Sequence, residues 1–282
     1  MAFKWSLNPY MGCEHRCTFC YVRAFEKRAD RPSDDRYGRA IRVKVNVAHV
    51  LRRELSRPRW KREVVAVGAA TDPYQPAEGK YRLTRACLEA FLDFANPVSL
   101  ITRGPMIVRD VDVLAALARR TELSVNFSIP TLDRETWRRT EPGTAPPRQR
   151  LKAVEKLVAA GVNAGIGMAP LLPGISDKPQ LIDDVVRAAR EAGATHLWSG
   201  VLYLREGTRE HFMQSLARHW PELMPAYERM YARQAYLPAA TTRPLHKLVS
   251  DARERHQIAD RRLPRSQPAV AQDAEQLLLL AV

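Results

Sequence analysis

The chain has 282 residues, of which 45% are apolar, and a formal net charge of +14. This length supports a sizeable hydrophobic core in one large or two small domains, and four cysteines are too few to staple so long a chain with disulfides. The N-terminal residues 1–11 contain no apolar stretch of signal-peptide length, and the C-terminal run LLLLAV is too short to span a bilayer. We therefore expect a cytoplasmic protein with no membrane partner.

Short apolar runs alternate with longer amphipathic ones along most of the chain. The apolar runs predict buried strands near residues 4–7 and at 64–69, 98–102, 123–129, 162–168 and 196–204. The amphipathic stretches predict helices at 83–95, 109–120, 146–161 and 178–193. About six β/α units in alternation predict an α/β fold with a parallel sheet, either open or curled into a barrel.

Two segments flank this regular pattern. A single domain large enough for an enzyme is expected over residues 1–249, because no linker interrupts this stretch. Residues 250–282 are polar and punctuated by proline, so we expect a disordered C-terminal tail there.

The loop after the first predicted strand contains Cys13, Cys17 and Cys20, three of the chain's four cysteines. Loops at the carboxyl ends of parallel strands are where ligand sites gather in such folds. In a reducing compartment, clustered cysteines are more often metal ligands or catalysts than disulfides. The spacing leaves three interpretations open. The three thiolates can hold a [4Fe–4S] cluster with one iron left for another ligand, they can form a zinc site completed by His15, or they can be a compact redox site.

Positive charge is concentrated near the N-terminus. Residues 1–62 carry 16 Lys and Arg against 6 Asp and Glu, with the densest group at residues 49–62. Such a surface suits a polyanion, because each neutralised phosphate releases counterions. A nucleic acid is therefore a candidate partner of the basic N-terminal region, and a solvated helix face is the alternative.

The loop after the second predicted strand, GAATDPYQPAE, begins with small residues that allow a ligand to approach the backbone. Its Asp-Pro and Gln-Pro pairs also suit a simple turn. The fourth cysteine, Cys87, falls inside the next predicted helix and is expected to pack in the core as a small hydrophobe. The polar candidates for ligand contact in this loop are Thr71, Asp72, Gln75 and Glu78.

The three-two spacing of the cysteines, with Phe19 before the last of them, resembles the signature of the radical S-adenosylmethionine (SAM) superfamily. The stretches NPYMGCEHRCTFCY, TDPYQPAE, RTEP and APLLPGISD resemble the branch that contains spore photoproduct lyase and proteins labelled DNA repair photolyase. This resemblance implies a partial (βα)6 radical SAM barrel with a [4Fe–4S] cluster and SAM as cofactors. It also implies a reductant such as flavodoxin or ferredoxin, and a 5′-deoxyadenosyl radical that abstracts hydrogen from a substrate.

The same resemblance implies roles for individual residues. The cluster ligands are Cys13, Cys17 and Cys20. The implied SAM contacts are Phe19 beside adenine, Thr71 and Asp72 at the amino end, Ser128 at the ribose, and Arg150, or its neighbour Arg148, at the carboxylate. From the residues alone, Ser128 can equally be a satisfied strand-end serine and Arg150 a solvated helix arginine.

One feature departs from the lyase pattern. Spore photoproduct lyase is expected to return a hydrogen atom from a cysteine near the second-strand loop, and this loop reads VGAATDP, without a thiol. Either Tyr10, Tyr21 or Tyr74 is the catalytic substitute, or the reaction is a different one. The competing function class is a non-enzymatic, zinc-bearing nucleic-acid-binding module.

Overall fold

The computed structural model describes residues 3–260. Six parallel strands form one sheet in which spatial order follows chain order, β1-β4-β5-β6-β7-β8. Each strand lies at one of the predicted apolar runs, so the expected parallel sheet of a partial radical SAM barrel is confirmed. The strands are β1 Trp5–Leu7, β4 Val65–Val67, β5 Val98–Thr102, β6 Leu123–Ser128, β7 Ala164–Leu171 and β8 Leu197–Val201.

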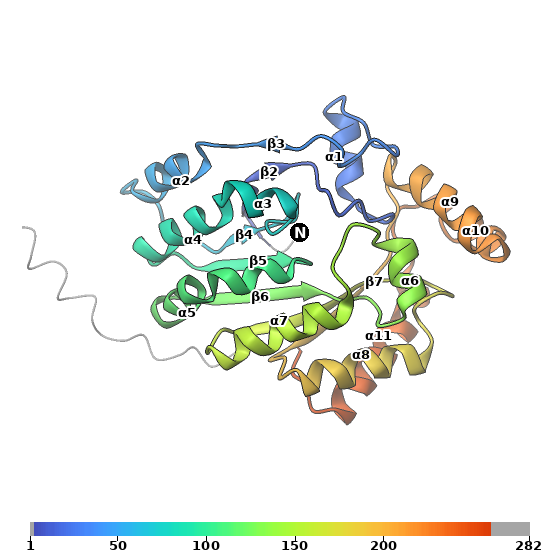
Figure 1. Cartoon of the computed structure of the whole chain (residues 1–282). Coiled ribbons are helices and arrows are strands. Elements are labelled where there is room, and N and C mark those ends of the chain that lie inside the picture. The colour runs from blue at the N-terminus through green and yellow to red at the C-terminus, as the bar shows by residue number, and fades with distance from the viewer. Residues whose placement is uncertain (1–2, 261–282) are drawn as a thin grey trace, which may run out of the picture.

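Helices connect successive strands and cover one face of the sheet (Figure 1). The four predicted helices correspond to α4 Leu83–Asp93, α5 Val111–Arg120, α7 Pro147–Ala159 and α8 Pro179–Glu191. Among the described helices, none is long and apolar enough to cross a membrane. The remaining elements are β2 Tyr10–Met11, α1 Val22–Arg28, β3 Arg42–Val43, α2 Val47–Leu55, α3 Pro76–Tyr81, η1 Pro105–Asp110, α6 Arg134–Thr140, α9 Thr208–His219, η2 Pro221–Leu223, α10 Met224–Met230 and α11 Ala239–Arg255.

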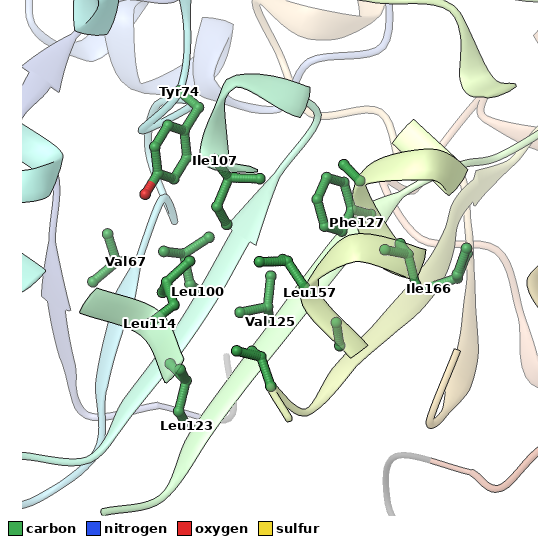
Figure 2. Packing of buried hydrophobic residues seen from close by; sticks show 14 of the residues in the cluster. Val67, Tyr74, Leu100, Ile107, Leu114, Leu123, Val125, Phe127, Leu157 and Ile166 are labelled. Atoms are coloured by element: carbon green, nitrogen blue, oxygen red, sulfur yellow. The ribbon is translucent and has the colours of Figure 1, made fainter. Parts of the chain in front are cut away.

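The core lies between the sheet and these helices. Figure 2 shows alternate strand residues, such as Leu100, Val125 and Phe127, packed against Leu114 and Leu157 of the covering helices. All five side chains are fully buried. Because side chains alternate across a strand, the intervening residues lie on the opposite face of the sheet.

That opposite face is polar rather than a second hydrophobic core. The Asn126 side-chain oxygen lies 3.0 Å from both the His196 Nε2 and the Trp198 indole nitrogen. Glycine is required at two neighbouring positions of β7, because a Cβ at Gly165 would lie 2.5 Å from the His196 ring and one at Gly167 2.8 Å from the Trp198 ring. The inner face of the sheet is therefore shaped by small residues and hydrogen-bonding groups.

The expected boundary of the tail at residue 250 is wrong. Helix α11 continues to Arg255, with Val249 and Ala252 buried, and Ile258 beyond it is also buried. The backbone N–H of Leu197 in β8 donates to the Ala259 carbonyl at 3.0 Å. The few apolar residues in this segment are separated by charged ones, so the sequence resembles a tail. In the structure, one face of α11 packs on α8 and β8. The rest of the expected tail, residues 261–282, lies outside the described residues.

Matched substitutions on α11 test this correction. Ala252→Asp places a carboxylate at a position with no exposed surface, and we expect it to lower the free energy of unfolding by more than about 2 kcal/mol. Ala240→Asp, in the exposed first turn of the same helix, serves as the control and should change stability little. Urea unfolding measures the stability of both variants. Equal stabilities would show that residues 250–255 do not pack on the domain.

Candidate active site

Three cysteines occupy the loop between β2 and α1, at the carboxyl edge of the sheet. Cys13 and Cys17 are buried, Cys20 is partly exposed, and all three are free thiols. Burial raises the pKa of Cys13, and the charges of Asp72, Cys20 and Cys17 raise it further, so the three thiols act on one another. Cys87, in contrast, is 1% exposed in the core of α4, as predicted.

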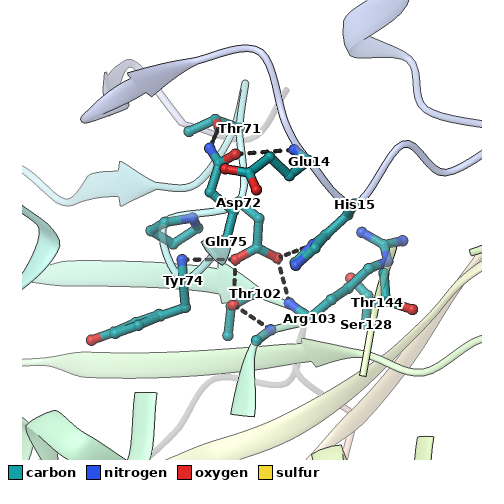
Figure 3. Close-up of polar contacts among 12 residues, drawn as sticks. Glu14, His15, Thr71, Asp72, Tyr74, Gln75, Thr102, Arg103, Ser128 and Thr144 are labelled. Atoms are coloured by element: carbon teal, nitrogen blue, oxygen red, sulfur yellow. Dashed lines mark hydrogen bonds and ion pairs between the residues drawn. The ribbon is translucent and has the colours of Figure 1, made fainter. Parts of the chain in front are cut away.

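The loop after β4 holds the cysteine loop in place (Figure 3). The Thr71 hydroxyl donates to the Gly12 carbonyl at 2.6 Å, and the Gln75 amide nitrogen donates to the same carbonyl at 3.2 Å. The Gln75 side-chain oxygen accepts from the Glu14 backbone N–H at 3.0 Å. Thr71 and Gln75 therefore position the backbone on both sides of Cys13.

Asp72 connects three loops. One carboxylate oxygen accepts from the Tyr74 N–H at 2.8 Å and the Thr102 hydroxyl at 2.6 Å. The other accepts from the Arg103 N–H at 2.6 Å and lies 3.3 Å from the His15 Nδ1. Burial acts to raise the pKa of Asp72, but His15, Thr102 and the Arg103 N–H lower it to about 2. Its charge therefore stabilises the fold above about pH 4 and loses this effect as the pH falls toward 2.

Arg150 is fully buried, and its guanidinium is bound within the protein. It donates to the Ser128 backbone carbonyl at 2.8 Å, to the Ala145 carbonyl at 2.9 Å and to the Glu141 carboxylate at 2.8 Å. The interchangeable candidate Arg148 is exposed. The alternative of a solvated arginine is thus wrong for Arg150, and a SAM carboxylate would have to compete with these partners.

Arg103 is a cation whose charge acts on the Cys17 and Cys20 thiols, and no motif in the sequence indicates this role. Its guanidinium carbon lies 5.5 Å from the centre of the Phe19 ring, and its Nε donates to Glu141 at 2.8 Å. Burial raises the pKa of Cys17 to about 12, and the Arg103 charge opposes this rise. The one indication of Arg103 in the sequence is its position, because it lies in the stretch ITRGP directly after a predicted strand.

Glu141 thus bridges two arginines. Burial acts to raise the pKa of the Glu141 carboxyl, but Arg150 and Arg103 hold it below its ordinary value. Glu141 belongs to the RTEP stretch, and its neighbour Gly143 donates its N–H to the His15 carbonyl at 3.0 Å. A Cβ at Gly143 would lie 2.3 Å from the Glu14 carbonyl oxygen, so this close approach to the cysteine loop needs glycine.

Two of the three candidate tyrosines are held inside the fold by carboxylates. The Tyr10 hydroxyl donates to Glu78, and the Tyr74 hydroxyl donates to Asp110 at 3.1 Å. Both rings are buried, and Tyr74 lies beside core residues in Figure 2. Burial raises the pKa of both hydroxyls, and the neighbouring carboxylates raise it further.

Tyr21 has a different setting, because it directly follows Cys20 and is only partly buried. Its hydroxyl donates to the Ala69 carbonyl, and burial raises its pKa to about 12. Its ring centre lies 5.9 Å from that of Tyr203, which stacks on Tyr236 at 4.8 Å. Among the three candidates, Tyr21 is the one in the cysteine loop.

The basic residues 49–62 lie away from this site. They include α2 and lead directly into β4, so they lie at the amino edge of the sheet, whereas the cysteine loop is at the carboxyl edge (Figure 1). Part of their charge is paired, since Arg52 contacts Asp93 at 2.5 Å and Arg57 contacts Glu54 at 2.8 Å.

The donor set does not suit a single metal ion. In residues 3–260, no three His, Cys, Asp or Glu side chains converge on one metal position. A tetrahedral zinc needs such convergence, whereas a cubane cluster takes one thiolate per iron, at separated corners. The residues that the structure describes therefore contain no preformed tetrahedral zinc site.

Comparison with known proteins places this site in a family. The sequence profile described as "Radical SAM superfamily" matches residues 7–185. The chain belongs to the radical SAM superfamily. It is an enzyme, and the alternative of a non-enzymatic zinc module is set aside.

The relatives cover most of the chain. An uncharacterised protein of Mycobacterium tuberculosis is 36% identical over 259 residues, which are 92% of this chain and 76% of that protein. The radical SAM Nalpha-GlyT isomerase of Pseudomonas phage M6 is 28% identical over 172 residues, which are 60% of this chain and 33% of that protein. A structure of a spore photoproduct lyase variant shares the fold, with a TM-score of 0.62 at 15% identity over 89% of this chain and 73% of that chain.

Substitution of Glu141 tests the buried bridge. Glu141→Gln leaves Arg103 and Arg150 without their shared counter-charge, and we expect the free energy of unfolding to fall by about 3 kcal/mol. Glu135→Gln, on exposed α6 surface, is the matched control and should be near neutral. Urea unfolding compares them, and equal stability of the two variants would show that the bridge does not hold the loops together.

Proposed function

We propose that this protein cleaves SAM reductively at a [4Fe–4S] cluster held by Cys13, Cys17 and Cys20, and that its substrate is a nucleic acid. The observation that carries the proposal is one loop with three free thiols, fastened to the ends of β4 and β5 and facing Arg103. The fourth cysteine lies in the core of α4, so it is not available to complete a closed site.

The chain supplies the ligands, their burial and the charge around them. When bound, the cluster provides the electron that splits the SAM sulfonium and the open iron that holds the amino acid part of SAM. Arg103 offsets the negative charge that gathers as the thiols lose their protons. Burial of Cys13 and Cys17 keeps water and oxygen from the sulfurs.

SAM would lie beside Phe19, whose ring already faces Arg103. Thr71, Asp72, Ser128 and Arg150 remain the expected neighbours of SAM. Their contacts support an indirect role as well, because Thr71 and Asp72 position the cysteine loop while Arg150 holds the end of β6 through the Ser128 carbonyl.

A nucleic-acid substrate is supported by two relatives and by charge. The lyase structure is described as containing AdoMet and a dinucleoside spore photoproduct, and the phage relative is named an Nalpha-GlyT isomerase. The chain itself carries +14. The loop after β4 has no thiol, so we assign the hydrogen-donor role to Tyr21, the candidate tyrosine in the cysteine loop. A flavodoxin or ferredoxin would supply the electron.

Cysteine variants test the cofactor assignment. After anaerobic reconstitution, Cys13→Ala, Cys17→Ala and Cys20→Ala should each lose iron and sulfide, because two cluster irons are then left without protein ligands. Cys87→Ala is the matched control and should retain the cluster, since this thiol packs in α4. Dithionite and SAM should yield 5′-deoxyadenosine with the wild type and Cys87→Ala only. Iron retained in the loop variants, or lost only in Cys87→Ala, would overturn the assignment.

A further inference from the structure

A basic cavity of about 390 Å³ lies on the outer side of the cysteine loop. Its walls come from the cysteine loop with α1, from α6 and from α9, which are grouped at the right of Figure 1. The charged and titratable residues that matter most in its lining are Arg16, Arg23, Arg138, Arg139, His211 and Arg218.

Little negative charge balances these arginines. Asp35 is the one carboxylate among the described lining residues. Arg139 pairs with Glu135 outside the cavity. Within residues 3–260, no carboxylate lies at ion-pair distance from Arg16, Arg138 or Arg218. The cavity is therefore a local concentration of positive charge, beyond what the net charge of the chain produces elsewhere.

Two buried side-chain nitrogens in the lining have no hydrogen-bond partner in the described part of the chain. Arg23 is 1% exposed and donates to the Ser33 and Asp34 carbonyls at 2.7 and 2.8 Å, yet its Nε has no hydrogen-bond partner. His211 Nδ1 likewise has no hydrogen-bond partner, although it lies at ion-pair distance, 3.7 Å, from Asp35. An unsatisfied buried donor is costly, so the Arg23 Nε–H calls for an acceptor.

The backbone at Arg16 adds a separate observation. Arg16 has a φ of 49°, in the left-handed region that glycine and asparagine occupy more readily than arginine. This conformation places an exposed arginine within the cysteine loop, between Cys13 and Cys17. Uncommon backbone conformations of this kind gather at functional sites.

We propose that this cavity binds a backbone phosphate of the nucleic-acid substrate, an inference that rests on the proposed function. Guanidinium groups bind phosphate through paired N–H donors, and arginines from three elements surround the cavity. Several arginines exceed the charge of one phosphate, which fits a strand with successive phosphates better than a single small anion.

The cavity wall is hydrogen-bonded to the cysteine loop. The Thr18 N–H donates to the Thr140 carbonyl at 2.9 Å, and the Gly143 N–H donates to the His15 carbonyl at 3.0 Å. These bonds join the cavity wall on α6 to the loop that carries the thiols. A phosphate held here fixes the distance between the strand and the cysteine loop, and so positions one nucleotide for reaction.

Two double variants with the same charge change test this site. Arg138→Gln/Arg218→Gln removes two exposed guanidiniums from the cavity rim. Arg59→Gln/Lys61→Gln removes two exposed charges just before β4, at the other edge of the sheet. The probe is a fluorescein-labelled single-stranded oligothymidylate, and its anisotropy is measured against the reconstituted full chain over a range of salt concentrations.

The cavity variant should bind the oligonucleotide about tenfold or more weakly. The slope of its log affinity against log salt concentration should fall by about 1.4, because each lost phosphate contact on a single strand lowers this slope by about 0.7. The control should stay within about twofold of the wild type. Equal weakening of both variants would show a general charge effect, and unchanged affinity of the cavity variant would remove the site. If the cavity variant instead loses only its rate of reduction by flavodoxin, the surface binds the electron donor and the proposal is wrong. Formation of 5′-deoxyadenosine by the wild type is measured separately. Its absence would show that the proposed function is wrong, independently of whether the cavity binds the oligonucleotide.

Discussion

The site depends on one buried carboxylate. Asp72 accepts hydrogen bonds from the loops after β4 and β5 and contacts His15 of the cysteine loop, so a single side chain joins three segments distant in sequence. An ionised carboxylate is stable in such a place only because these donors replace its water. Its charge also faces the buried thiols and raises the pKa of Cys13. The same group therefore orders the loop and makes an unligated thiolate unfavourable.

Glu141 balances this arrangement on the other side of the cysteine loop. It pairs with Arg103 and Arg150, and Arg103 in turn lies over Phe19 and opposes the rise in the pKa of Cys17. Negative charge at Asp72 and positive charge at Arg103 thus flank the thiols. A cluster with three thiolate ligands would add negative charge, which the Arg103 guanidinium would partly offset.

Much of the fold was predictable, whereas the pairing of charges was not. Strands β4 to β8 follow from continuous apolar runs, and the cysteine loop from its spacing. The ion-pair bridge from Arg103 through Glu141 to Arg150 is not predictable from the sequence. Glu141 lies 38 residues from Arg103, and no local pattern indicates their contact. The segment after residue 249 resembles a tail in the sequence because Ala252 and Ile258 are isolated among charged residues. The concentration of positive charge at residues 49–62 is visible in the sequence. The topology, however, places it at the amino edge of the sheet, opposite the cysteine loop.

The proposed function requires that Cys13, Cys17 and Cys20 hold three irons of a cluster and that the fourth iron is free to bind SAM. Electron paramagnetic resonance of the anaerobically reconstituted, dithionite-reduced protein tests this most directly. We expect saturating SAM to change the g values and line shape of the reduced cluster, because its amino and carboxylate groups would bind the open iron. A reduced cluster whose spectrum is the same with and without SAM would contradict it.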